Sequence, residues 1–320
     1  MVIGAHEPDL EYKIGALQDS VERVIKGKSE AVELALVTLL AGGHLLIEDV
    51  PGTGKTTLAH ALARSFDCSF QRIQFTSDLL PSDLTGVSIF NQVEQQFEFR
   101  SGPLFANVIL ADEVNRTTPK TQSALLEAMS DGRITVDGHT YPLPQPFTVI
   151  ATQNPAEYHG TYPLPESQLD RFLMRIPMGY PKESYEEEIL RSQINYHTAE
   201  LLEPVLTGQE IVQCQRAIEQ VTVQQVLLKY LMALVRATRE SEFLALGVST
   251  RGAMALYRAS QAIAFMRGRE YVTPDDVKRL AVPIFAHRVL VSSNYSSPLG
   301  KSQEVEGIIQ DLVGQVLVPF

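Results

Sequence analysis

The stretch "EDVPGTGKTT" places two glycines, a lysine and two threonines at a bend between an apolar run and a helical one. Gly52 and Gly54 permit a turn in which backbone N–H groups point inward, and Lys55 adds a positive charge. A helix that begins here adds the positive end of its dipole. Such a bend cradles a polyphosphate, and Thr56, the last position of G-x-x-x-x-G-K-[ST], would place its hydroxyl on Mg²⁺. The stretch therefore predicts a phosphate-binding loop.

A second candidate group is the acidic pair that ends the apolar run "NVILADE". Such a run is typical of a central parallel strand, and parallel sheets bind ligands at the carboxyl edge of their strands. Asp112 would hold the magnesium shell there, and Glu113 would accept a proton from, or orient, the attacking water. Asn154 follows the next apolar run and could hold that water. Such residues are more often found in solvated turns, but their position after a phosphate loop favours a hydrolytic site.

The composition excludes several classes of protein. With 320 residues and 44% hydrophobic content, the chain can form one large core and a smaller satellite domain. Its net charge of −11 argues against sequence-blind binding to nucleic acid. Two distant cysteines indicate neither a disulfide framework nor a zinc site. The acidic N-terminus and the lack of a run of about 20 apolar residues predict a cytoplasmic protein with no membrane span.

The first half of the chain alternates between strand and helix patterns, which predicts an α/β domain with a parallel sheet covered on both faces. The expected strands are 44–50, 69–75, 107–113 and 146–152. The expected helices are 31–42, apolar almost all round, one that follows the phosphate loop, and one that begins at Pro119 after the N-cap Thr118 and ends before Gly132.

Two segments interrupt this alternation and are expected as hairpins, at 83–103 and, around Asp137-Gly138, at 132–144. They are either plain surface loops or contacts with partners. From about residue 183, apolar residues recur at helical spacing and no strand is indicated.

These patterns divide the chain into two expected domains. An α/β nucleotide-binding domain that carries both hairpins would span residues 1–182, and a helical lid would span residues 183–320. A hinge is expected at 178–183.

Five segments together resemble the MoxR family of AAA+ ATPases, in its helix-2-insert branch: "GHLLIEDVPGTGKTTLA", "PSDLTG", "GPLFANVILADEVNRTTPKTQSALLEAM", "ATQNP" and "LPESQLDRFLMR". The resemblance covers the α/β domain nearly end to end, and the helical part is similar to that family's lid. Asp49 stands where the phosphate-loop pattern has its first glycine, a position at which this family often carries an acidic residue.

The resemblance implies a role for each matching residue. The Walker A loop would be Gly52, Thr53, Gly54, Lys55, Thr56 and Thr57. The remaining roles would be Walker B for Asp112 and Glu113, metal binding for Thr56 and Asp112, sensor 1 for Asn154, the arginine finger for Arg171, sensor 2 for Arg251, and adenine contacts for Val24, Ile25 and Gly27. The segment 83–103 would be the helix-2 insertion, and the Asp137-Gly138 hairpin would be the one that precedes sensor 1.

The arginines leave alternatives open. An arginine finger is worth ~10³ or more in rate, but only where it reaches the γ-phosphate. Arg171 is not expected to reach its own site, so it would serve a neighbouring copy in a ring. Arg175, expected on the same helical face as Arg171, and Arg116 are rival candidates, and pairing with nearby acids is the commoner fate of an arginine. Whether Arg251 acts in cis or across the interface stays open.

The expected function is an ATPase that remodels a protein client by changing the angle between lid and base. The resemblance implies ATP and Mg²⁺ as cofactors, a homo-oligomeric ring, expected as a hexamer, and a chaperone that matures partner complexes or inserts cofactors and metals into them. A partner with a von Willebrand factor A domain is implied in the same way.

Two other classes of function are the alternatives. A nucleotide-gated nucleic-acid motor is opposed by the acidic charge balance and by hairpins with few arginines. A binding module that does not hydrolyse nucleotide is opposed by the complete set of Lys55, Asp112, Glu113 and Asn154.

Overall fold

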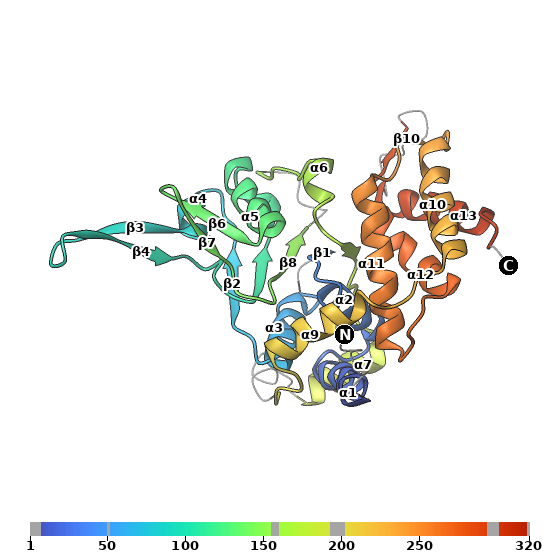
Figure 1. The fold of residues 1–320 in the computed structure, drawn as a ribbon, viewed down its shortest axis with the longest axis horizontal. Coiled ribbons are helices and arrows are strands. Elements are labelled where there is room, and N and C mark those ends of the chain that lie inside the picture. The colour runs from blue at the N-terminus through green and yellow to red at the C-terminus, as the bar shows by residue number, and fades with distance from the viewer. Residues whose placement is uncertain (1–7, 50–51, 155–159, 193–201, 293–300, 319–320) are drawn as a thin grey trace, which may run out of the picture.

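The computed structural model describes residues 8–49, 52–154, 160–192, 202–292 and 301–318. Its centre is a five-stranded parallel sheet in the order β2-β5-β8-β1-β9. The strands are β1 (Leu45–Glu48), β2 (Phe70–Gln74), β5 (Val108–Asp112), β8 (Thr148–Gln153) and β9 (Met174–Ile176). Figure 1 shows a helical bundle beyond one edge of the sheet and a long hairpin that projects beyond the other. The predicted α/β fold with a following helical lid is confirmed.

The central strands are apolar throughout because both of their faces are buried. Alternate residues of a strand enter two different cores: Val108 and Leu110 belong to one, and Ile109 and Ala111 to the other. The first core is covered by α1 (Pro8–Val24), α2 (Ser29–Leu40) and α3 (Lys55–Ser65), and the second by α4 (Pro81–Thr85) and α5 (Pro119–Asp131). The α5 helix has Thr118 as its N-cap and Gly132, in a left-handed conformation, as its C-cap.

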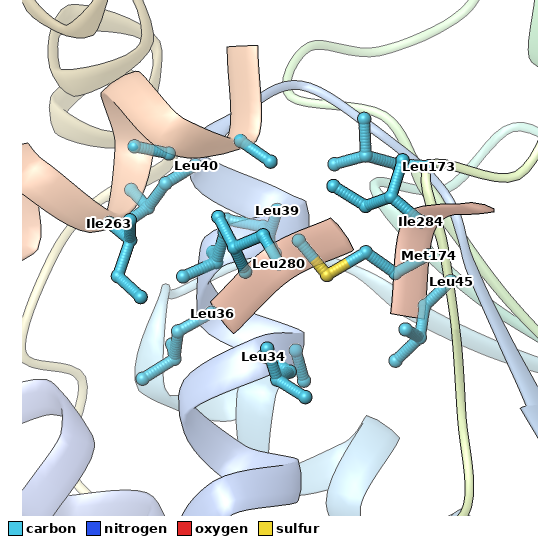
Figure 2. Packing of buried hydrophobic residues seen from close by; sticks show 14 of the residues in the cluster. Leu34, Leu36, Leu39, Leu40, Leu45, Leu173, Met174, Ile263, Leu280 and Ile284 are labelled. Atoms are coloured by element: carbon cyan, nitrogen blue, oxygen red, sulfur yellow. The ribbon is translucent and has the colours of Figure 1, made fainter. Parts of the chain in front are cut away.

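Helix α2 joins the sheet to the bundle. Figure 2 shows its leucines, Leu34, Leu36, Leu39 and Leu40, packed among side chains of β1, β9, α11 (Thr250–Met266) and α12 (Pro274–Phe285). This position explains why α2 is apolar on nearly every side. The chain turns after it at Gly42, whose φ of +69° suits glycine. The apolar core therefore runs without a break from the sheet into the bundle.

The bundle comprises α10 (Gln225–Glu240), α11, α12 and α13 (Lys301–Gln315), and α9 (Gly208–Ile218) packs between α2 and α11. A reciprocal capping box between Thr207 and Glu210 starts α9, and at the start of α12 the Asp276 carboxylate accepts from the backbone N–H and the hydroxyl of Thr273. A short antiparallel pair, β10 (Leu244–Leu246) and β11 (Leu290–Val291), lies where the sequence indicated no strand. None of the helices in the described part of the chain is long and apolar enough to cross a membrane.

Two hairpins extend from the second core. In the longer one, β3 (Gly86–Asn91) pairs with β4 (Gln96–Ser101), and in the shorter one, β6 (Arg133–Val136) pairs with β7 (His139–Pro142). Asp137 and Gly138 turn the shorter hairpin with φ of +50° and +80°. The rings of Phe99 and Tyr141 stack with centroids 4.1 Å apart, which fixes one hairpin against the other near their base.

Candidate active site

The phosphate loop leads directly into α3. Gly54 is the N-cap of that helix with φ of +91°, and Gly52 has φ of +83°, so a side chain at either position would be strained. Leu58 and Leu62 on α3 are buried in the first core, which fixes the N-terminus of the helix at the carboxyl edge of the sheet.

The side chains of the phosphate loop lie at this helix start. Lys55 Nζ donates a hydrogen bond of 3.0 Å to the backbone oxygen of Asp49. Thr53 is buried, and Thr56 and Thr57 are partly buried in the first turn. Val50 and Pro51 lie outside the described residues.

Asp49, the departure from the phosphate-loop pattern, has a structural partner. Its Oδ2 accepts hydrogen bonds from the backbone N–H groups of Met178, at 2.9 Å, and Gly179. Lys28 Nζ donates to the carbonyl oxygens of Gly179, at 2.9 Å, and Tyr180, at 2.5 Å. Burial lowers the pKa of Lys28, and the charge of Asp49 opposes that shift. The acidic residue therefore ties the phosphate loop to the segment that leads out of the sheet.

Asp112 is 9% exposed at the end of β5, and protein donors occupy both of its carboxylate oxygens. Thr152 Oγ1 donates to Oδ1 at 2.6 Å, and Arg72 Nη2 donates to Oδ2 at 2.7 Å. Thr152 Oγ1 also accepts from the backbone N–H of Glu113 at 2.9 Å. One buried hydroxyl thus fixes the positions of both acids. Sequence reasoning missed Thr152, although a polar residue near the end of an apolar strand was a signal that could have identified it.

Glu113 is held from two sides. Its Oε2 accepts from Gln74 Nε2, at 2.8 Å, and from Arg116 Nη1, at 2.9 Å. Its backbone is left-handed, with φ of +58°, a conformation that residues other than glycine adopt mainly at functional or strained positions. Arg116, a rival arginine finger in the sequence, pairs with the acid of its own chain.

Asn154 follows β8 directly and is 8% exposed. The neighbouring residue, Gln153, accepts at its backbone oxygen from the N–H of Asp49 at 3.2 Å. Contacts therefore run from Lys55 through Asp49 to β8, and from β8 through Thr152 to Asp112 and Glu113. The structure brings these four sequence-predicted groups, the lysine, the two acids and the asparagine, to one edge of the sheet.

Arg171 and Arg175 do not share a helical face, so that expectation was wrong. Helix α6 (Glu166–Leu169) ends before both, and Arg175 lies in β9. Arg175 Nη1 donates to Glu48 Oε2 on β1 at 2.8 Å, and its Nη2 donates to Glu306 Oε1 on α13 at 3.1 Å. Its side chain is 11% exposed. Arg175 therefore links the sheet to the C-terminal helix of the same chain.

Arg171 lies against α5. Its Nη1 donates to the backbone oxygen of Leu126 at 2.7 Å and to Ser130 Oγ, while its Nε is buried without a hydrogen-bond partner among the described residues.

Arg251 is exposed in the first turn of α11. Burial and, to a lesser extent, the charge of Arg251 lower the pKa of Arg288 to about 10. Ser249, the N-cap of α11, donates to Asp170 Oδ2 at 3.0 Å, so Arg251 lies where the bundle meets the segment that precedes β9.

A cavity of about 680 Å³ lies between the start of α2, the segment after β9, and helices α12 and α13. Gly27 and Met178 are among the lining residues, and the Cε of Met178 lies 3.7 Å from the position that a Cβ on Gly54 would occupy. Val24 and Ile25, by contrast, are buried in the first core. Met178 therefore borders both the cavity and the phosphate loop.

The residues at the sheet edge fit a magnesium ion that is shared with phosphates. No group of three His, Cys, Asp or Glu side chains in the described ranges is arranged to hold a metal ion by itself. Mg²⁺ prefers oxygen ligands and commonly takes one or two from protein and the others from phosphate and water. The Asp112 carboxylate and the Thr56 hydroxyl are donors of this type.

Comparisons with known proteins agree with this geometry. The family described as "ATPase family associated with various cellular activities (AAA)" matches residues 44–174, and "AAA lid domain" matches residues 236–312. The uncharacterized protein YeaC of Bacillus subtilis is 47% identical over 317 residues, which cover 98% of each chain. Chaperone MoxR1 of Mycobacterium tuberculosis is 40% identical over 282 residues, which cover 85% of this chain and 74% of that protein.

A solved structure of a Cytophaga hutchinsonii protein assigned as an ATPase superposes with a TM-score of 0.88 at 39% identity, covering 97% of this chain and 96% of the other. The relatives, the family matches and the sheet-edge geometry lead to one conclusion: the chain belongs to the MoxR family of AAA+ ATPases.

Proposed function

We propose that this ATPase uses Mg²⁺ and ATP to remodel, mature or load a protein client in a chaperone-like manner. The observation that carries the proposal is the meeting of Lys55, Asp112, Glu113 and Asn154 at one edge of the sheet. A relative that shares 40% of its residues is named a chaperone, which supports a protein client.

Each group at the edge has a proposed task. Lys55 and the N–H groups of the loop from Gly52 to Thr57 would hold the β- and γ-phosphates. Thr56 and Asp112 would hold the magnesium ion, which when bound neutralises phosphate charge. Asn154 would position the attacking water, and Glu113 would take its proton.

Glu113 must be able to turn toward the attacking water when nucleotide is bound. Gln74 and Arg116 both hold one oxygen of its carboxylate, Oε2. We infer that the described arrangement is a resting one and that nucleotide binding loosens at least one of these two bonds.

The base of the nucleotide would occupy the cavity beside Gly27, where the ring of Tyr185 leaves no room for a side chain. Val24 and Ile25 would support this wall from the core, since both are buried. The lining from α12 and α13 would let the lid respond to the nucleotide.

A second copy of the chain would complete the site. Arg171 is bound to α5 of its own chain, but its buried Nε has no hydrogen-bond partner within the described ranges, which favours a different placement of the guanidinium in the assembled protein. We propose that it serves the neighbouring subunit of a hexameric ring, with Arg251 as the sensor on the lid. Membership of the helix-2-insert branch and a partner with a von Willebrand factor A domain belong to the same proposal.

The first test is Glu113→Gln, which keeps an oxygen that can accept from Gln74 and Arg116. We expect ATP to stay bound and phosphate release to fall by about 10²- to 10⁴-fold, the usual contribution of a general base. Glu127→Gln, at an exposed position on α5, is the matched control and should behave as the parent protein. Undiminished phosphate release would refute the role of Glu113.

The same variant tests the class of client. With ATP it should retain a protein client in a pull-down, while Lys55→Ala, which should not bind nucleotide, serves as the blank. Enrichment of nucleic acid without protein would favour the motor alternative.

A further inference from the structure

Arg72 makes a contact that the proposed function leaves unexplained. It lies on the edge strand β2, and its Nη2 stands 2.7 Å from Oδ2 of Asp112. Thr152 already occupies Oδ1. A metal ion that binds Oδ2 of Asp112 must therefore displace the guanidinium of Arg72.

The position of Arg72 is not required by packing. On β2, Ile73 is the buried residue, whereas Arg72 and Gln74 lie on the exposed face. In the strand register, Arg72 is level with Leu110 and Gln74 with Asp112, so the guanidinium reaches along the sheet toward the carboxyl edge. The side chain of Arg72 is 48% exposed, compared with 12% for Asp112. It can turn into solvent without opening the core.

Arg72 also belongs to a row of donors on β2. Its Nη2 donates to Gln74 Oε1 at 3.3 Å, and Gln74 donates in turn to Glu113. The two residues of β2 thus hold Asp112, which ends the adjacent strand, and Glu113, which follows it.

We propose that Arg72 is a resident cation that takes the place of the metal at Asp112 until nucleotide arrives. A guanidinium and Mg²⁺ within a few ångströms of one carboxylate repel each other, so the ion binds only when Arg72 withdraws. A metal ion alone is a weak competitor for this site. Phosphate oxygens supply the additional ligands that make the exchange favourable. Arg72 therefore makes metal binding depend on nucleotide.

The inference rests on the proposed nucleotide site and is tested by metal affinity, without measurement of turnover. The probe is Mn²⁺, followed by the electron paramagnetic resonance of the free ion with saturating ADP and the full-length chain. Arg72→Gln should tighten the apparent Kd for Mn²⁺ by about 2- to 5-fold, the scale of a half-exposed ion pair. Arg72→Lys, which keeps the charge, should lie between the variant and the parent protein. ADP affinity in EDTA should be the same in all three proteins.

The control is Arg133→Gln, at an exposed arginine that begins β6, and it should leave the Mn²⁺ affinity unchanged. An unchanged or weakened Mn²⁺ affinity in Arg72→Gln would overturn the inference, and a weakened one would mean that Arg72 orients Asp112 for the metal. If ADP binds with the parent affinity in every variant, such a result counts against Arg72 alone. If the parent protein fails to bind ADP with or without Mn²⁺, the proposed nucleotide site itself is refuted, and this inference with it.

Discussion

The carboxyl edge of the sheet and the β3–β4 hairpin are built in opposite ways. At the edge, Asp112 and Asn154 are less than 10% exposed, and both carboxylate oxygens of Asp112 and one of Glu113 have protein donors. On the hairpin, Val93 is 93% exposed and Phe97 is 73% exposed. The ring centroids of Phe97 and Phe90 lie 5.3 Å apart. The hairpin carries its own backbone ladder far from the bundle (Figure 1).

This difference predicts where substitutions will have large effects. Removing the partner of a buried polar group at this edge should lower both the stability of the protein and its activity. Replacing an exposed side chain should change the stability little. An exposed apolar patch on an ordered projection is characteristic of a contact surface. We therefore expect the edge to control turnover and stability, and the hairpin to control coupling to a client.

The largest effect is expected at Arg171, which we propose completes the site of a neighbouring copy. Arg171→Ala should lower kcat by about 10³-fold with little change in KM, as for loss of an arginine finger. Mixed with Lys55→Ala, which has an intact Arg171 but an inactive site, it should regain turnover as the two proteins assemble together. Failure of every mixture to restore activity would place the action of Arg171 within its own chain.

The next effect concerns the amino end of β1, where His44 is buried between Met129 and Val149. Its Nε2 lies 3.0 Å from the Met129 oxygen, and its Nδ1 accepts from the Val149 N–H at 3.0 Å. Burial lowers the pKa of His44 from 6.5 to about 4, against a smaller opposing effect of the Met129 bond. The unfolded chain thus binds a proton at higher pH than the folded one. The contribution of neutral His44 to the free energy of unfolding is fully present above pH 6.5. It falls by on the order of 3 kcal/mol as the pH drops toward 4.

Urea unfolding at pH 7, 6 and 5 measures this loss. His44→Gln can still accept from Val149 and donate to Met129, but it does not titrate. Its free energy of unfolding should therefore fall less steeply with acid than that of the parent protein. Equal slopes would show that His44 does not contribute to the acid sensitivity.

Arg175→Met tests the connection between the edge and the bundle. Loss of two bonds to Glu48 and Glu306 should lower the free energy of unfolding by about 2 kcal/mol. Arg258→Met removes the exposed pair with Glu219 and should change it by less than about 0.5 kcal/mol. A thousandfold loss of turnover with unchanged stability would instead make Arg175 the arginine finger.

The smallest effect on the folded chain is expected at the hairpin. Phe97→Ser should change stability by less than about 0.5 kcal/mol and leave basal turnover unchanged, because the ring is mostly exposed. In the Glu113→Gln background it should reduce the amount of client retained. Phe99→Ser, which loses the stack on Tyr141, should cost about 1 kcal/mol. Undiminished client capture by Phe97→Ser would remove the hairpin from the proposed contact.

Much of the fold was readable because its signals are local. The glycines and lysine of the phosphate loop, the apolar runs of β5 and β8, and the caps of α5 lie within a few residues of what they specify. Helix α1 was not predicted, although Ile14, Leu17 and Val21 recur at helical spacing and are buried. Strand β9 has three residues, too few for a period to appear.

The local residue pattern predicts a phosphate loop, an acidic pair at a strand end and a helical second part in this chain. Tertiary structure alone decided that Asp49 holds the backbone at 178–179, that Thr152 joins the two acids, and that Arg72 rather than solvent faces Asp112. It also decided that Arg175 points into its own chain. The physical reason is that these pairs are distant in sequence and meet across neighbouring strands, so the partner of each polar side chain is set by sheet order and register.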